Sequence, residues 1–227
     1  MPLPQILIDA FENKTVFGKG GTAHSLAGNI TLSEADLLYS IIKILKPQRS
    51  LEIGFGQGIS SLAILQALKE NGTGSHHVLD PFQSDYDYAG IEMVNRAGLS
   101  DYLTFHEDFA ENIIPGLGDI DFTFIDSSHL FDLTMLDFIF TDRKLRKGGV
   151  IGFHDLDFPA LRKLIKYILA NRSYEILRLP QLEPIYRLNI MSEFYSLRSL
   201  LRRLYNESKK PISLMVYGNI IFLKKIG

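Results

Sequence analysis

The stretch that decides the fold is Leu51-Glu52-Ile53-Gly54-Phe55-Gly56-Gln57-Gly58, in which glycines at three alternating positions follow a short apolar run. The residues Ser50–Ile53 predict a strand, and the apolar pattern from about Ser60 to Glu70 predicts a helix after the glycines. In a doubly wound sheet, ligands bind beyond the carboxyl ends of the strands. Glycines there let backbone N–H groups approach a ligand closely, so this turn is the predicted cofactor site.

Strands and helices alternate along most of the remaining chain. Further strands are predicted at His77–Asp80, Leu103–His106, Asp121–Asp126, Gly149–Phe153, Tyr174–Leu179 and Asn219–Lys224. Helices are predicted at Ala89–Ala97, Leu130–Arg143 and Ala160–Ala170, with a short helix or turn at Glu111–Leu117. Strict alternation and strands that are apolar throughout are typical of a parallel sheet covered on both faces. The predicted fold class is α/β, a doubly wound, mostly parallel seven-stranded sheet of the Rossmann-like type.

Two flanking segments complete a predicted single domain of residues 1–227. Residues 1–46 include an N-terminal helix that Ser33 is expected to cap. Residues 47–179 form the predicted cofactor-binding core. Residues 180–227 contain the last strand and, before it, a predicted helical insertion. Five apolar residues of this insertion recur at helical spacing: Met191, Phe194, Leu197, Leu201 and Leu204.

The composition is that of a globular protein and argues against several classes of function. Of the 227 residues, 46% are hydrophobic and 22% are charged, as is ordinary for a folded protein. A net charge of −2 lacks the basic excess of a dedicated nucleic-acid binder. Neither a signal peptide nor an apolar run of roughly 20 residues is found, so a cytoplasmic protein with no membrane partner is expected. The absence of cysteine excludes disulfides and thiolate chemistry.

Two positions at the glycine turn favour a cofactor with an amino-acid moiety over a dinucleotide. The dinucleotide pattern G-x-G-x-x-G needs its third glycine at position 59, which is Ile59 here. Glu52 precedes the turn, and its carboxylate can accept a hydrogen bond from an ammonium group. An NAD-dependent oxidoreductase stays open as the alternative enzyme. A non-catalytic cofactor-binding or interaction protein is the alternative from a different class.

Acidic and aromatic residues follow the next two predicted strands. Asp80 can accept hydrogen bonds from both hydroxyls of a ribose. Asp108 can accept one from an adenine amino group, with Phe82 or Phe109 packing on the ring. Each acid alone could be a solvated loop residue or a helix cap. Three acids at successive strand ends, with Glu52 as the first, instead indicate a site for a nucleoside.

The segment Leu51–Gly58 resembles the first motif of the class I S-adenosylmethionine-dependent methyltransferases. The resemblance extends from about Thr31 to Asp155 and is strongest to small-molecule O-methyltransferases of the caffeoyl-CoA and macrocin types, which share segments like Phe124–His129 and Leu145–Asp155. It implies S-adenosylmethionine as the cofactor and a small-molecule acceptor methylated on a hydroxyl oxygen. The residues it implies for the cofactor are Glu52, Gly54, Phe55, Gly56, Gly58, Asp80, Phe82, Asp108, Phe109 and Asp126.

Four ionisable residues, Asp126, His129, His154 and Asp155, are expected where the fourth and fifth strands end, and two mechanisms stay open for them. In the first, His129 or His154 is the general base. In the second, Asp126 and Asp155 hold a cation such as Mg²⁺, which lowers the pKa of the acceptor oxygen. The related metal-dependent families have carboxylates at Asp126 and at the pair His154–Asp155, so His154 departs from their pattern.

Basic residues cluster near the C-terminus. They are Arg198, Arg202, Arg203, Lys209 and Lys210. Charged runs on helices are usually solvated faces, which is the interpretation favoured here. The alternative is a lid or a contact in a homodimer.

Overall fold

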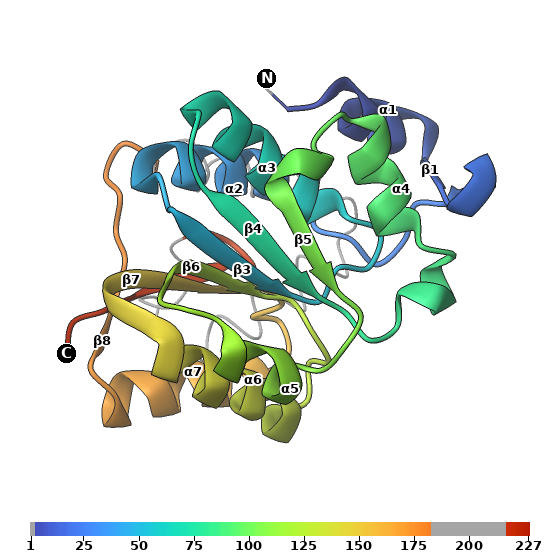
Figure 1. Cartoon of the computed structure of the whole chain (residues 1–227). Helices are drawn as coiled ribbons and strands as arrows, with labels where there is room; N and C mark the ends of the chain where they lie inside the picture. Colours follow the sequence, from blue (N-terminus) through green and yellow to red (C-terminus); the bar gives the residue numbers. More distant parts are fainter. Residues whose placement is uncertain (1–2, 183–216) are drawn as a thin grey trace, which may run out of the picture.

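Seven strands form one sheet in the order β5-β4-β3-β6-β7-β9-β8 in the computed structural model (Figure 1). The structure describes residues 3–182 and 217–227, so the predicted helical insertion and its basic residues lie outside it. The strands of the sheet are β3 (Arg49–Ile53), β4 (Ser75–Leu79), β5 (Leu103–His106), β6 (Ile120–Ile125), β7 (Leu145–Phe153), β8 (Tyr174–Ile176) and β9 (Ile221–Lys225). Strand β9 runs antiparallel to both of its neighbours, β7 and β8. The predicted mostly parallel seven-stranded sheet is confirmed.

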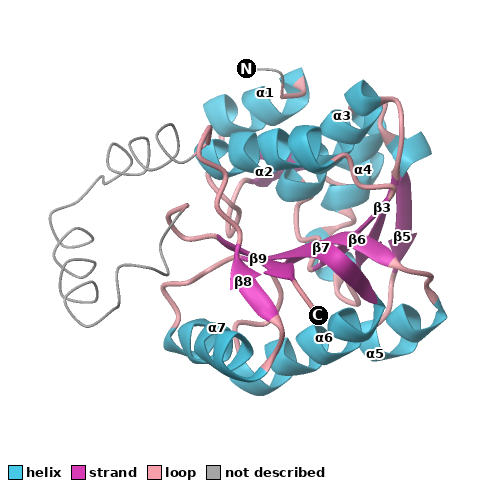
Figure 2. Ribbon diagram, turned by 90° about the vertical axis from the view of Figure 1, so that its left-hand side faces the viewer, coloured by secondary structure: helices cyan, strands magenta, loops and turns pink. Residues whose placement is uncertain are grey.

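Helices cover both faces of this sheet (Figure 2). One face carries α1 (Gln5–Asn13), α2 (Leu32–Leu45), α3 (Ile59–Asn71) and α4 (Ala89–Arg96), and the other carries α5 (Ala110–Ile113), α6 (Phe131–Lys144) and α7 (Pro159–Asn171). Successive side chains of a strand point to opposite faces, so the core is divided in two. Phe124 of β6 packs on the side of α1 to α4, and Ile125 packs on the other side.

The remaining described helical elements are short 3₁₀ turns. The 3₁₀ turns are η1 (Lys19–Gly21), η2 (Gln83–Tyr86), η3 (Ser100–Tyr102) and η4 (Ile114–Gly116). Across residues 3–182 and 217–227, no helix combines the length and the apolar character needed to cross a bilayer.

The N-terminal region contains elements that the sequence patterns did not predict. Strands β1 (Thr15–Phe17) and β2 (Ala23–Ser25) form an antiparallel pair of their own, closed by η1. Three-residue strands are too short to produce a recognisable alternation. The pair packs on α4, where the guanidinium group of Arg96 lies 4.1 Å from the centre of the Phe17 ring.

Helix α2 is capped by Thr31, which corrects the prediction of Ser33. The Thr31 hydroxyl accepts a hydrogen bond from the backbone N–H of Glu34 at 3.2 Å. In return, the Glu34 carboxylate accepts one from the backbone N–H of Thr31 at 2.8 Å. This reciprocal pair is a capping box, and Ser33 lies inside the first turn. The capping box fixes the buried carboxylate of Glu34 at the start of α2.

The glycine turn after β3 lies directly against the end of β6. Gly54 has a φ of +94°, and a Cβ at this position would lie 2.1 Å from the carbonyl oxygen of Asp126. The backbone N–H of Gly54 donates to Leu79 at 2.9 Å, and that of Asp126 donates to Ile53 at 3.0 Å. The ends of β3, β4 and β6 are therefore held together at a place where only glycine fits.

Replacing Gly54 by alanine should lower the free energy of unfolding by about 3 kcal/mol or more, because the new methyl group collides with the backbone of β6. Gly56→Ala is the matched control. Its φ is +48°, but nothing lies within 4 Å of the added Cβ. It should cost only about 1 kcal/mol, from the left-handed backbone. Urea unfolding measures both variants, and equal losses would contradict the close contact at Gly54.

Candidate functional site

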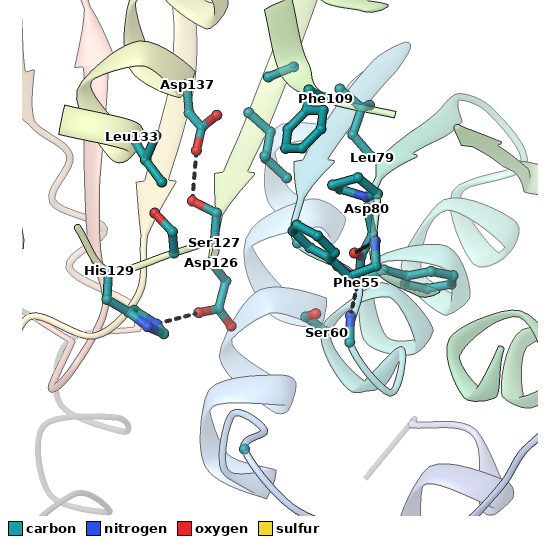
Figure 3. A pocket seen from close by; sticks show the side chains of 18 of the residues that line it. Phe55, Ser60, Leu79, Asp80, Phe109, Asp126, Ser127, His129, Leu133 and Asp137 are labelled. Carbon is teal, nitrogen blue, oxygen red and sulfur yellow. Dashed lines mark hydrogen bonds and ion pairs between the residues drawn. The ribbon is translucent and has the colours of Figure 1, made fainter. Parts of the chain in front are cut away.

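A pocket of about 480 Å³ opens at the carboxyl ends of the parallel strands (Figure 3). The chain builds β4 and β5 on one side of β3 and then crosses to build β6 and β7 on the other. The order of the strands therefore reverses between β3 and β6, which is where doubly wound sheets bind ligands. The volume is typical of sites for small molecules and cofactors.

Most of the residues predicted for cofactor binding line this pocket. They are Gly54, Phe55, Gly56, Asp80, Phe82, Asp108, Phe109 and Asp126. Gly58 and Glu52 are not part of its lining. Gly58 begins α3 with a φ of +80°, and a Cβ there would lie 2.9 Å from Gly90 of α4, so it permits the close packing of two helices.

Asp80 joins the glycine turn to the end of β4. Its Oδ2 accepts hydrogen bonds from the backbone N–H groups of Phe55 and Gly56 at 3.1 and 2.9 Å, and one from Gln83 at 3.0 Å. Its Oδ1 accepts one hydrogen bond, from the backbone of Phe82 at 2.9 Å. A carboxylate oxygen has two lone pairs, so Oδ1 can accept a further hydrogen bond from a ligand.

Two aromatic rings stand beside Asp80 at the mouth of the pocket. Phe82 and Phe109 meet edge to face, with ring centres 5.9 Å apart, and both are about half exposed. Exposed aromatic rings in a pocket offer a surface on which a flat heterocycle can pack. Asp108 is partly exposed, and its Oδ1 accepts from the backbone N–H of Phe109 and from Asn112 at 2.7 Å each. These two hydrogen bonds hold the pKa of Asp108 below its usual value.

Glu52 lies behind the pocket wall and is fully buried. The hydroxyls of Ser60 and Ser61 donate to its two carboxylate oxygens, and His76 lies 2.9 Å from Oε2. Of these groups, Ser60 lines the pocket. Direct contact between Glu52 and an ammonium group remains a prediction. In this arrangement, Ser60 stands between that carboxylate and the pocket.

Part of the pocket wall comes from the N-terminal segment. Gly28, Asn29 and Ile30 line it. The side chain of Gln57 holds this segment over the glycine turn. Its Oε1 accepts from the backbone of Ala27 at 3.0 Å and from Asn29 at 2.7 Å. The segment is therefore tied directly to the predicted cofactor turn.

The four ionisable residues predicted at the ends of β6 and β7 do come together. His129 Nε2 lies 2.5 Å from Asp155 Oδ2 and 3.6 Å from Asp126 Oδ1. His154 Nδ1 lies 3.2 Å from Asp126 Oδ1 and 3.4 Å from Asp155 Oδ1. Asp126, His129 and Asp155 line the pocket, whereas His154 is buried and is not part of its lining.

The ionised forms of these four residues stabilise one another. The close approach of His129 to the carboxylates of Asp126 and Asp155 raises its pKa to about 9, so its ring is positively charged at neutral pH in this arrangement. Burial disfavours the charged form of His154, but its contacts with Asp126, Asp155 and Glu34 outweigh burial and raise its pKa. Burial likewise disfavours the carboxylates of Asp126 and Asp155, yet the two histidines hold both pKa values below the usual range.

Both His129 and Asp155 have a left-handed backbone, with φ of +58° and +57°. A residue other than glycine in this region costs of order 1 kcal/mol or more and often occurs at functional sites. Two contacts hold these residues in place. Asn219 donates to Asp155 Oδ1 at 2.9 Å. The ring of Phe158 stacks on His129 with centres 4.7 Å apart.

Several pocket residues were not singled out from the sequence. They are Ser60, Glu111, Ser127 and Asp137. Asp137 of α6 accepts a hydrogen bond from the hydroxyl of Ser127 at 2.7 Å. Burial, with a smaller contribution from Glu111, raises the pKa of Asp137 to about 6. Asp137 lies within a helix, at a spacing that is ordinary for a polar residue, so the sequence gives no sign that it lines a pocket.

Comparisons with known proteins show that the chain is similar to methyltransferases. A family model described as a methyltransferase domain matches residues 51–156. The caffeoyl-CoA O-methyltransferase 2 of Zea mays is 29% identical over 150 residues, covering 59% of this chain and 55% of that protein. The catechol O-methyltransferase B of Danio rerio is 25% identical over 158 residues, covering 66% and 58%. The chain thus spans little more than half the length of these relatives.

Two solved structures share the fold. The O-methyltransferase TomG from Streptomyces achromogenes, in complex with SAM, has a TM-score of 0.60 at 16% identity, covering 88% of this chain and 82% of that one. An O-methyltransferase from Bacillus cereus, in complex with SAH, also has a TM-score of 0.60, at 18% identity, covering 78% and 83%. At these identities the likeness establishes the fold.

The raised pKa of Asp137 predicts a stability that depends on pH. The pKa is about 6 in the folded protein against an ordinary 3.8, so the folded state binds the proton more tightly. Stability should therefore fall as pH rises from about 4 to about 6, by up to roughly 3 kcal/mol for a shift of this size. Asp137→Asn should remove this loss and raise the unfolding midpoint in urea at pH 7.5 but not at pH 4.

The matched control is Asp132→Asn, which removes an exposed acid from the same helix. It should leave the pH profile of the parent protein unchanged. If both variants have the same profile between pH 4 and 7.5, the partly buried carboxyl of Asp137 is not the source of the pH dependence.

Proposed function

We propose that this chain, whose residues 51–156 match a methyltransferase-domain model and which is similar to caffeoyl-CoA and catechol O-methyltransferases, is an S-adenosylmethionine-dependent methyltransferase that transfers a methyl group to a hydroxyl oxygen of a small molecule. One observation carries the proposal. A single pocket joins Asp80 and the glycine turn to the cluster of Asp126, His129 and Asp155. A cofactor and an acceptor can thus meet at one edge of the sheet.

The nucleoside of the cofactor is assigned to the end of the pocket near β4 and β5. Asp80 Oδ1 has the capacity to accept from a ribose hydroxyl. Phe82 and Phe109 provide apolar surface for the adenine ring. The methionine moiety is assigned to the glycine turn and Ser60. The Ser60 hydroxyl donates its proton to Glu52, so its oxygen presents lone pairs that suit an ammonium group.

The reaction itself makes modest demands on the protein. The bond between the sulfonium sulfur and the methyl carbon breaks, the acceptor oxygen bonds that carbon, and S-adenosylhomocysteine and a proton are released. The protein must align the oxygen with the methyl group and find a place for the proton. His129, at the pocket wall, is the residue we assign to the proton. Its ring must first lose to solvent the proton that Asp126 and Asp155 stabilise, and Nε2 can then accept the proton of the acceptor hydroxyl.

The residues at the ends of β6 and β7 also fit a divalent cation. Asp126, His154 and Asp155 each offer one ligand atom, and these atoms all lie within 4.8 Å of one another. His154 Nδ1 lies 3.2 and 3.4 Å from the carboxylates of Asp126 and Asp155, so the three side chains converge on one place that would hold the ion. When bound, such a cation would lower the pKa of the acceptor hydroxyl.

Three expectations about partners belong to the same proposal. The acceptor is a small molecule, because the pocket has the size of a small-molecule site. No nucleic acid is expected, given the net charge of −2. A homodimer stays a prediction that light scattering would test.

Calorimetric titration with S-adenosylhomocysteine and with NAD tests the cofactor. S-adenosylhomocysteine should bind with a micromolar dissociation constant and NAD should not bind. Asp80→Asn should weaken S-adenosylhomocysteine binding by about tenfold or more, because it removes the charge that accepts the ribose hydroxyl.

Asp85→Asn is the control for this titration, since it removes an exposed acid from the loop that follows Asp80. It should leave the dissociation constant within about twofold of the parent value, a difference of about 0.4 kcal/mol. Binding of NAD in preference to S-adenosylhomocysteine would instead indicate an oxidoreductase. A protein that binds neither compound would end the methyltransferase proposal.

His129→Asn tests the proton step. It should lower the rate of methyl transfer to a catechol or similar acceptor by roughly 10²–10⁴-fold, the usual contribution of a general base. The dissociation constant of S-adenosylhomocysteine should stay within about threefold, or about 0.7 kcal/mol. If the variant lost both cofactor binding and activity, His129 would instead be a residue that maintains the shape of the pocket.

A further inference from the structure

His154 lies between the carboxylates of the pocket and a third carboxylate behind it. Its Nδ1 faces Asp126 Oδ1 and Asp155 Oδ1 at 3.2 and 3.4 Å. Its Nε2 faces Glu34 Oε2 at 3.4 Å, across the interface between β7 and α2. Both His154 and Glu34 are more than nine-tenths buried. The two ring nitrogens therefore have different environments, one toward the pocket and one toward Glu34.

Glu34 is held in this position independently of His154. Its Oε2 accepts from the backbone N–H and the hydroxyl of Thr31 at 2.8 and 3.0 Å. Because the capping box fixes the carboxylate, His154 faces an anchored carboxylate. A metal-bound histidine typically donates its other ring N–H to a carboxylate, which fixes the tautomer and makes the ligand more basic. Glu34 occupies the place of such an outer carboxylate.

The set of ligand atoms selects among cations. Mg²⁺ prefers oxygen ligands, whereas an imidazole nitrogen suits first-row transition metals. Resting on the function proposed above, we propose that this site takes a first-row transition cation, with His154 Nδ1, Asp126 and Asp155 as ligands and Glu34 as the outer partner that orients His154. Glu34 is thus a positioning residue on α2.

The arrangement of His129 agrees with a cation at this place. Its Nε2 approaches both Asp126 and Asp155, at 3.6 and 2.5 Å, from the pocket side. A cation bound to Asp126 and Asp155 would therefore compete with His129 for these two carboxylates.

Titration of the chelator-treated protein with Mn²⁺ and with Mg²⁺ tests the proposal, with bound Mn²⁺ counted from its electron paramagnetic resonance signal. One Mn²⁺ should bind per chain, at least tenfold more tightly than Mg²⁺. His154→Asp replaces the nitrogen ligand by oxygen and should reduce the ratio of the two dissociation constants by tenfold or more. Equal affinities for the two cations, unchanged in His154→Asp, would overturn the proposal.

Glu34→Gln tests the outer partner. It should weaken Mn²⁺ binding by 10–100-fold, the usual effect of losing such a group. Ser33→Ala is the control, because it changes the same first turn of α2 and leaves both Thr31 and Glu34 in place. It should weaken Mn²⁺ binding by less than threefold. Equal weakening in both variants would overturn the role of Glu34.

Titration with S-adenosylhomocysteine in the same samples separates the two proposals. A protein that binds S-adenosylhomocysteine but neither cation would overturn the metal site and leave the methyltransferase function standing. A protein that binds neither cation nor S-adenosylhomocysteine would overturn both.

Discussion

The contact between Gly54 and the backbone of Asp126 is the constraint on which the rest of this structure depends. It presses the turn after β3 against the end of β6, and the hydrogen bond from Gly54 to Leu79 adds the end of β4. Any side chain at position 54 would separate these strands. Because the turn lies there, Asp80 can accept from its backbone N–H groups, and Asp126 emerges at the neighbouring strand end beside the same pocket.

The second organising feature is electrostatic. Asp126 and Asp155 meet His129 and His154 at the ends of β6 and β7, and Glu34 reaches the back of His154 from α2. Buried carboxylates are costly unless a positive group or a metal ion compensates them. Here the histidines lower the pKa values of both aspartates. The left-handed backbone at His129 and Asp155 is a further cost, and it persists because neighbours such as Asn219 and Phe158 hold these residues.

Most strands and helices of the central sheet could be predicted from the sequence, whereas some of the elements around it could not. The predicted strands at residues 121–126 and 149–153 are apolar enough to be identified as buried strands, and the glycines mark the turn between β3 and α3. The antiparallel pair of β1 and β2 was missed because each strand has only three residues. At α2, Ser33 was the predicted cap, whereas Thr31 fills this place through its reciprocal hydrogen bonds with Glu34, which only the folded helix contains.

For the site, the sequence by itself determined which residues stand at the strand ends, because the alternation of strands and helices brings those ends to one edge. It therefore identified Asp80, Asp126 and Asp155 as pocket residues. Only the tertiary structure decided which way each side chain turns. Glu52 also stands near a strand end, yet the pleat of β3 directs its side chain toward Ser60, Ser61 and His76 beneath α3. Likewise, Glu34 lies 120 residues before His154 in the chain, and no local pattern relates them. The packing of α2 on the sheet brings them together, since contacts between distant segments depend on how whole elements pack.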